Sequence, residues 1–161
     1  IIDLTAFFNN KAESNTNHGY GEAKSAIQEA KNILVCRDLI RVAIFCKNAL
    51  DAQNLDGILG LQIVGRKITF HILVLPSTGV YTMYELGSVK LPDTLHDLPK
   101  LLMDMPAILR ILDVFDRLCI RSADPPQPTR HHPTVSLSVF NGIFSSTQDR
   151  KRPCYLKQYH N

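Results

Sequence analysis

The segment from Gln28 to Gln53 constrains the fold more than any other part of the sequence. Its residues favour helix, and apolar side chains point in nearly every direction around the helix axis. A helix that is apolar on all sides is buried, so we expect it at the centre of the fold. Arg37 and Arg41 are four residues apart and would be neighbours on one face of this helix. The polar residues among the apolar ones in its middle include Arg37, Asp38, Arg41, Lys47 and Asn48.

Length and composition fit a single domain. With 161 residues, 45% of them hydrophobic, the chain is long enough to bury one substantial core. It begins with Ile1 rather than Met, so we expect a fragment or a processed piece. No apolar run reaches the roughly eighteen residues that a membrane span needs, and no basic-then-apolar leader opens the chain. We therefore expect a soluble protein, or the soluble part of one, with no membrane partner.

The four cysteines are widely spaced in the sequence. Cys36 and Cys46 fall inside the apolar helix, where a free thiol behaves as a small hydrophobic side chain and burial makes it inert as a nucleophile. The chain has no C-x-x-C pair, which argues against a structural zinc site. This cysteine usage fits a reducing intracellular compartment, either nuclear or cytoplasmic.

A block of strands follows the helix. The segments Gly57–Val64, Lys67–Leu75 and Val80–Leu86 read as strands, with turn residues at 65–66 and 76–79. Such short turns predict a three-stranded antiparallel meander.

Two helical pieces are predicted next, Leu98–Met103 and Pro106–Cys119, with Asp104 as a cap between them. Residues 124–133 contain four prolines and predict an extended connector, and residues 135–144 predict a short strand or helix. The buried stripe of the two helical pieces is expected to be Leu101, Leu102, Met105, Leu109, Leu112 and Phe115.

We divide the chain into an α/β core over residues 1–122 and a proline-rich connector with a basic C-terminal segment over residues 123–161. The net charge is only +3, but Arg150, Lys151 and Arg152 lie together near the end of the chain. Such a segment suits contact with nucleic acid, and equally a solvated terminus.

The strongest candidate for chemistry is the predicted strand His18–Lys24. Side chains alternate along a strand, so Glu22 and Lys24 would share one face. A carboxylate accepts a hard metal ion and a neighbouring ammonium can hold a water or a phosphate, as a metal-dependent phosphodiesterase requires. The same pattern recurs as Glu29-Ala30-Lys31 at the expected start of the helix, where charges are solvated, and we give that copy no catalytic role. The alternative for Glu22 and Lys24 is a surface pair on an edge strand.

Residues 19–24, Gly-Tyr-Gly-Glu-Ala-Lys, resemble the E-x-K strand of the PD-(D/E)XK nuclease superfamily, which has the restriction-endonuclease-like fold. Residues 37–51 would be the core helix of that fold, and residues 61–65 its next core strand. The chain is also similar to nuclease-like proteins of fungi, in which G-[FY]-G-E-[AV]-K precedes such a helix and a G-x-Y-x-M-x-E hairpin. Residues 79–85 match that hairpin, and the likeness covers roughly residues 1–120.

The resemblance implies a divergent, magnesium-dependent nuclease acting on DNA. Glu22 would be a Mg²⁺ ligand, and Lys24 would orient the attacking water or stabilise the developing charge. Gln62 would contact the site from the adjoining strand. Arg37 and Arg41 are candidates for contacts to nucleic-acid phosphates, or for pairing with Asp38 or with acids of the second helical region.

The resemblance departs from the family at the second acid, which should lie on the strand before Glu22. Asp3 is the only aspartate available there, and Glu13 the only glutamate. In the fungal proteins an aspartate stands just ahead of a pair like Ile1-Ile2, so the motif acid would come immediately before this sequence. Either Asp3 is a metal ligand with Glu22, or the acid lies outside the chain, or the domain is an inactive nuclease fold that binds nucleic acid or a protein partner.

The fold expected from these observations is an α/β domain with a mixed sheet packed on a central buried helix, restriction-endonuclease-like, with C-terminal helices and a basic tail. Other candidates are weaker. The pair His131-His132 lies in the proline-rich connector with no third metal ligand nearby in sequence. His71 falls inside an apolar strand and is expected to be a hydrogen-bonded core histidine.

Overall fold

The computed structural model describes residues 2–3, 17–28, 32–123 and 132–146. The predictions made for residues 29–31, for most of the connector and for Arg150, Lys151 and Arg152 concern residues outside these ranges. In chain order the elements are β1 (Ile2–Asp3), β2 (Gly19–Lys24), η1 (Ala26–Gln28), α2 (Asn32–Gln53), β3 (Gly57–Val64), β4 (Lys67–Ser77), β5 (Val80–Lys90), η2 (Leu95–Asp97), α3 (Leu98–Leu118) and α4 (Leu137–Ser146).

The strands form one five-stranded mixed sheet in the order β1-β2-β3-β4-β5. β2 runs parallel to β3, and α2 makes the crossover between them. The remaining neighbours are antiparallel, so β3, β4 and β5 form the predicted meander. The prediction of an α/β protein with a mixed sheet is confirmed. The prediction that the helix α2 is buried on all sides is wrong, because Val42 and Cys46 are buried whereas Ile33 and Cys36 are exposed.

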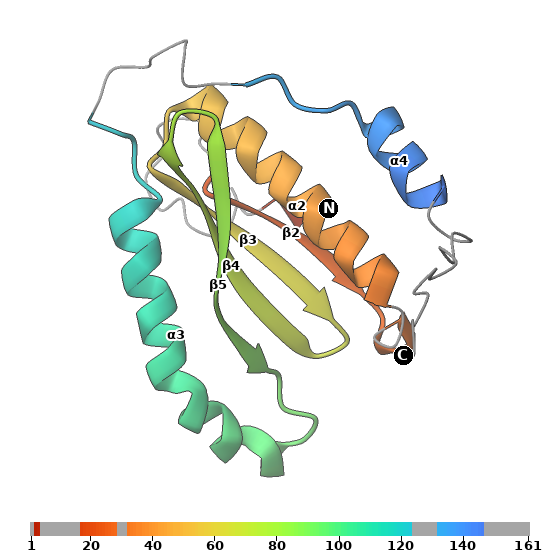
Figure 1. Cartoon of the computed structure of the whole chain (residues 1–161). Coiled ribbons are helices and arrows are strands. Elements are labelled where there is room, and N and C mark those ends of the chain that lie inside the picture. The colour runs from red at the N-terminus through yellow and green to blue at the C-terminus, as the bar shows by residue number, and fades with distance from the viewer. Residues whose placement is uncertain (1, 4–16, 29–31, 124–131, 147–161) are drawn as a thin grey trace, which may run out of the picture.

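Helices cover the two faces of the sheet: α2 packs on one and α3 on the other (Figure 1). β3 is apolar on both faces because it lies between these two layers. Its Ile58 packs with α2, whereas Leu59 and Leu61 pack with α3. Gly60 allows α2 to approach closely, since a Cβ there would lie 3.2 Å from Val42 Cγ1 and 3.6 Å from Cys46 Sγ of α2. It would also lie 2.5 Å from Met83 Cε of β5.

The helix α3 differs from the prediction of two pieces, because it continues unbroken through Pro106. A proline inside a helix removes the hydrogen bond to the carbonyl four residues earlier, here that of Leu102. Leu102 is exposed, so water can replace that hydrogen bond and the helix need not end. Asp104 is therefore an interior residue of α3 and not a cap.

The predicted buried stripe of this region is also wrong in most positions. Leu102, Met105, Leu109 and Leu112 are exposed, and Ile111 is the buried residue of α3. α3 carries apolar side chains on two sides, so periodicity alone did not decide which side would meet the sheet. The side that does so packs Ile111, Val114, Phe115 and Leu118 against β3 and β4.

The segment predicted as a short strand or helix is the helix α4. Among the described residues no helix has both the length and the apolar character that crossing a membrane would require.

Candidate functional site

Glu22 and Lys24 lie on the face of β2 that meets α2. Two residues earlier on the same face, the Tyr20 ring packs against Phe45 of α2 at 5.9 Å between centroids. The Lys24 Nζ lies 3.8 Å from Glu22 Oε1, so the period-two alternation of the strand brings the two side chains together.

The helix α2 adds two further charged side chains to this pair. Arg41 NH1 donates a hydrogen bond to Glu22 Oε1 at 3.0 Å and lies 3.8 Å from Asp38 Oδ1. Lys24 Nζ lies 3.4 Å from Asp38 Oδ2. These four residues, Glu22, Lys24, Asp38 and Arg41, are called the Glu22–Asp38 cluster below.

The two signs of charge in this cluster lie at different depths. The Glu22 and Asp38 side chains are 10% and 2% exposed, whereas those of Lys24 and Arg41 are 24% and 32% exposed. The acids are therefore buried between β2 and α2, and the two bases lie closer to solvent. The cluster holds two acids and two bases, so its formal charges balance, and this offsets part of the free energy lost by burying the acids.

Three carboxylate oxygens of the cluster are buried and make no hydrogen bond within the described residues: Glu22 Oε2, Asp38 Oδ1 and Asp38 Oδ2. Buried carboxylates are normally hydrogen-bonded, because an unsatisfied oxygen keeps much of the free energy lost on leaving water. An exception of this kind marks a place where an ion or a water can bind.

Gln62, predicted to contact the site from the adjoining strand, lies directly opposite Glu22 in the parallel register of β2 and β3. Its Nε2 donates to the backbone oxygen of Val35 at 2.7 Å and so fastens the start of α2 to the sheet. Arg37, by contrast, keeps a buried Nε without a hydrogen bond within the described part. Asp3 pairs with Tyr20 in the β1–β2 register, two residues before Glu22.

Asp38 is the residue that sequence reasoning did not select for the site. It is the single acid between Glu29 and Asp51, in a stretch of mostly apolar and basic residues. A lone carboxylate three residues before Arg41 in a mostly apolar helix was the signal available in the sequence. Arg41 pairs with Asp38, which was one of the two roles predicted for it.

A second charged cluster lies in the last turns of α2. Lys47 Nζ donates to Asp51 Oδ2 at 2.9 Å, to the backbone oxygen of His132 at 2.6 Å and to Thr134 Oγ1 at 2.9 Å. Tyr81 of β5 donates its hydroxyl to Asp51 Oδ1 at 2.7 Å, and Lys47 lies over its ring. We call Lys47, Asp51, Tyr81, His132 and Thr134 the Lys47 cluster.

The histidine and cysteines considered as candidates lie outside the Glu22–Asp38 cluster. His71 is buried as expected, and burial lowers its pKa, but its Nδ1 makes no hydrogen bond within the described residues. Burial raises the pKa of the Cys46 thiol to about 12 and that of Cys119 likewise to about 12, so both are inert at neutral pH. Cys36 is exposed, contrary to the expectation that the apolar helix buries it.

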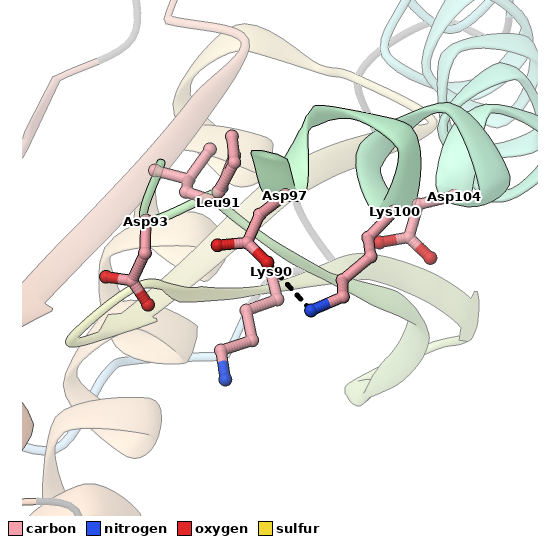
Figure 2. A pocket seen from close by; sticks show the side chains of 7 residues that line it. Lys90, Leu91, Asp93, Asp97, Lys100 and Asp104 are labelled. Atoms are coloured by element: carbon pink, nitrogen blue, oxygen red, sulfur yellow. Dashed lines mark hydrogen bonds and ion pairs between the residues drawn. The ribbon is translucent and has the colours of Figure 1, made fainter. Parts of the chain in front are cut away.

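A charged hollow of about 110 Å³ lies where β5 leads into α3 (Figure 2). Asp97 is joined there to Lys100 at 2.7 Å, and Asp93 pairs with Arg66. The hollow is lined by Lys90, Leu91, Pro92, Asp93, Asp97, Lys100 and Asp104, none of which belongs to the Glu22–Asp38 cluster. Because Asp93 and Asp97 already pair with basic side chains, this hollow is a weaker candidate for a ligand site than the Glu22–Asp38 cluster.

Within the described residues no three His, Cys, Asp or Glu side chains gather in an arrangement that would hold a metal ion. The Glu22–Asp38 cluster supplies two carboxylates. Mg²⁺ commonly uses one or two protein carboxylates together with water and substrate phosphates, so two are sufficient for a site completed by a phosphodiester.

The chain matches no model of a protein family, no curated protein and no solved structure.

Proposed function

We propose that this chain is a divergent nuclease-like domain that hydrolyses phosphodiester bonds in DNA with the help of Mg²⁺. The order of elements supports the proposal, since an E-x-K strand, a helix and a parallel strand follow one another as β2, α2 and β3. A restriction-endonuclease-like packing of the core is part of the same proposal.

The observation that carries the proposal is the set of buried carboxylate oxygens without hydrogen bonds beside Lys24. Oxygen ligands are those that Mg²⁺ prefers, and Glu22 Oε2 is such an oxygen with no other described partner. A divalent cation held there would supply a water of lowered pKa and neutralise charge on the phosphate.

The side chains of the cluster have distinct parts in this proposal. Glu22 would hold the cation from β2, and Asp3 of β1 is one of the candidates for the second acid. Lys24, partly exposed next to Glu22, would hold a phosphate oxygen or the attacking water. Arg41, the most exposed of the four side chains, would bind a neighbouring phosphate through its remaining donors.

The test is cleavage of plasmid and single-stranded DNA in the presence of Mg²⁺ or Mn²⁺. We expect Glu22→Gln and Lys24→Met each to lower the rate by roughly a hundredfold or more, because each removes a charge that acts on the transition state. Asp113→Asn is the matched control, since Asp113 is an exposed carboxylate that pairs with Arg117 on α3. Wild-type cleavage that persists in the Glu22 and Lys24 variants would refute the assignment of the site.

A second candidate function is a catalytically inactive module that binds nucleic acid. The observation that favours it is the charge balance of the cluster, in which each acid already lies near two bases. Fluorescence anisotropy with labelled DNA distinguishes the two functions. An inactive module would bind DNA without cleaving it, with affinity that falls as salt rises and that drops in Lys24→Met but not in Asp113→Asn.

A further inference from the structure

We propose that Glu22 and Asp38 together form the divalent-cation site, and that Arg41 acts as an internal counter-cation which the metal displaces. The inference rests on the proposed function, in which Glu22 holds a metal, and it assigns the second acid to α2 instead of the strand before Glu22. Three features of the cluster support it.

The first feature is the environment of Asp38. Its side chain is 2% exposed, and neither oxygen makes a hydrogen bond within the described residues. Its nearest cations are Lys24 at 3.4 Å and Arg41 at 3.8 Å. A carboxylate that served only to hold β2 against α2 would be expected to accept close hydrogen bonds, because these offset the free energy lost by burying it.

The second feature is the position of Arg41. Its NH1 lies 3.0 Å from Glu22 Oε1 and 3.8 Å from Asp38 Oδ1, so one guanidinium nitrogen faces an oxygen of each acid. Two carboxylates that approach one another in the interior repel unless positive charge lies between them. Arg41 supplies that charge.

The third feature is that the Arg41 guanidinium makes few close contacts within the cluster. Among the described contacts of the cluster, only Arg41 to Glu22 is a hydrogen bond; the other pairs lie 3.4–3.8 Å apart. The Arg41 side chain is 32% exposed, so it can move into solvent without crossing the core. A divalent cation would satisfy the unbonded oxygens directly, which the arginine does not.

The charge balance of the cluster also determines when a divalent cation can replace Arg41. The cluster is neutral as it stands, so a metal that enters without loss of Arg41 adds two uncompensated positive charges near the two bases. Binding is therefore opposed by Arg41 and favoured by an anionic phosphate backbone. Removing the arginine should strengthen metal binding, a gain that misfolding cannot produce.

The experiment measures Mn²⁺ binding by the whole chain, from the loss of the free-ion EPR signal, without DNA. We expect Arg41→Gln to bind Mn²⁺ roughly tenfold more tightly than wild type. Asp38→Asn and Glu22→Gln should each bind it roughly tenfold more weakly or worse, since each removes a ligand charge. Asp113→Asn is the control and should bind as wild type does.

The outcomes separate this inference from the proposed function. If Asp38→Asn binds Mn²⁺ as wild type does while Glu22→Gln cleaves no DNA, the helix acid is not a ligand and the nuclease proposal stands. An unchanged or weaker affinity in Arg41→Gln overturns the counter-cation role. If the binding pattern is as expected but the wild type cleaves no DNA, the cation site stands and the catalytic proposal fails. The absence of Mn²⁺ binding in wild type and in Arg41→Gln alike overturns the site.

Discussion

Helix α2 carries two charged clusters, and they differ in how well their polar atoms are satisfied. In the Lys47 cluster, Lys47 and the Tyr81 hydroxyl each donate to Asp51 over distances of 2.7–2.9 Å. In the Glu22–Asp38 cluster, three buried carboxylate oxygens make no described hydrogen bond, and Asp38 lies no closer than 3.4 Å to a described cation. The two clusters share one helix and similar residue types.

Under the proposed function, the difference separates a structural cluster from a candidate ligand site. The Lys47 cluster joins α2 to β5 and to the segment at His132 and Thr134, and its hydrogen bonds offset the burial of its charges. The Glu22–Asp38 cluster joins only β2 to α2 and leaves acceptor capacity unused. Buried acceptors without hydrogen bonds lower the stability of the fold, and they can accept a bond from a water or bind an ion.

The largest effect on stability is expected where the satisfied cluster is broken. Asp51→Ala removes the acceptor of Lys47 and Tyr81 and should lower the free energy of unfolding by about 2–3 kcal/mol. Asp38→Asn should change it by about 1 kcal/mol or less, because the cations near Asp38 are partly exposed and can be hydrated. Urea unfolding of both variants measures the difference.

Matched substitutions sharpen this contrast. Asp51→Asn retains one oxygen for the Tyr81 hydroxyl and should recover part of the loss seen in Asp51→Ala. A loss in Asp38→Asn as large as that in Asp51→Ala would show that both clusters are structural, and it would remove the basis for a ligand site at Glu22.

A middle-sized effect is expected from the packing that places both clusters. Gly60→Ala would put a methyl group 2.5 Å from Met83 Cε and 3.2 Å from Val42 Cγ1, beneath α2. We expect a loss of about 1–3 kcal/mol from overpacking. Gly142→Ala is the comparison in open space, since a Cβ at that position of α4 meets nothing within 4 Å, and it should gain about 0.5–1 kcal/mol from helix propensity. A Gly60→Ala variant as stable as wild type would mean that α2 does not depend on this close approach.

The smallest effect concerns His71, a buried neutral group with an unbonded Nδ1. Burial lowers its pKa below the ordinary value of 6.5, so below that pH the unfolded chain binds a proton that the native state does not. Stability from this group is complete above pH 6.5 and falls as the pH drops, by at most about 1.4 kcal/mol per pH unit. Urea unfolding at pH 5.5 and 7.5 should show a smaller decrease in His71→Gln than in wild type. An identical decrease in both proteins would contradict the role of His71.

Much of the sheet was predictable because its signals are local. The bounds of β3 agree with the predicted strand, and β4 and β5 begin at the predicted residues but extend further. Gly65 and Gly79 adopt positive φ angles of 59° and 72° in the two turns, a conformation that glycine adopts without strain. Glycines at these positions therefore allowed the meander to be predicted from the sequence. The prediction for α3 was less accurate, since both of its sides are apolar. Only the tertiary packing decides which side contacts the sheet.

The sequence by itself determined that Glu22 and Lys24 share a face, because alternation along a strand follows from the covalent geometry of the backbone. Only the tertiary structure decided that Asp38 and Arg41 join them. That meeting depends on the rotation and height at which the α2 crossover packs over β2 and β3, fixed by contacts such as Val42 over Gly60 and Gln62 to the Val35 carbonyl. Side chains far apart in the chain become one charged cluster through packing, which no local pattern of residues encodes.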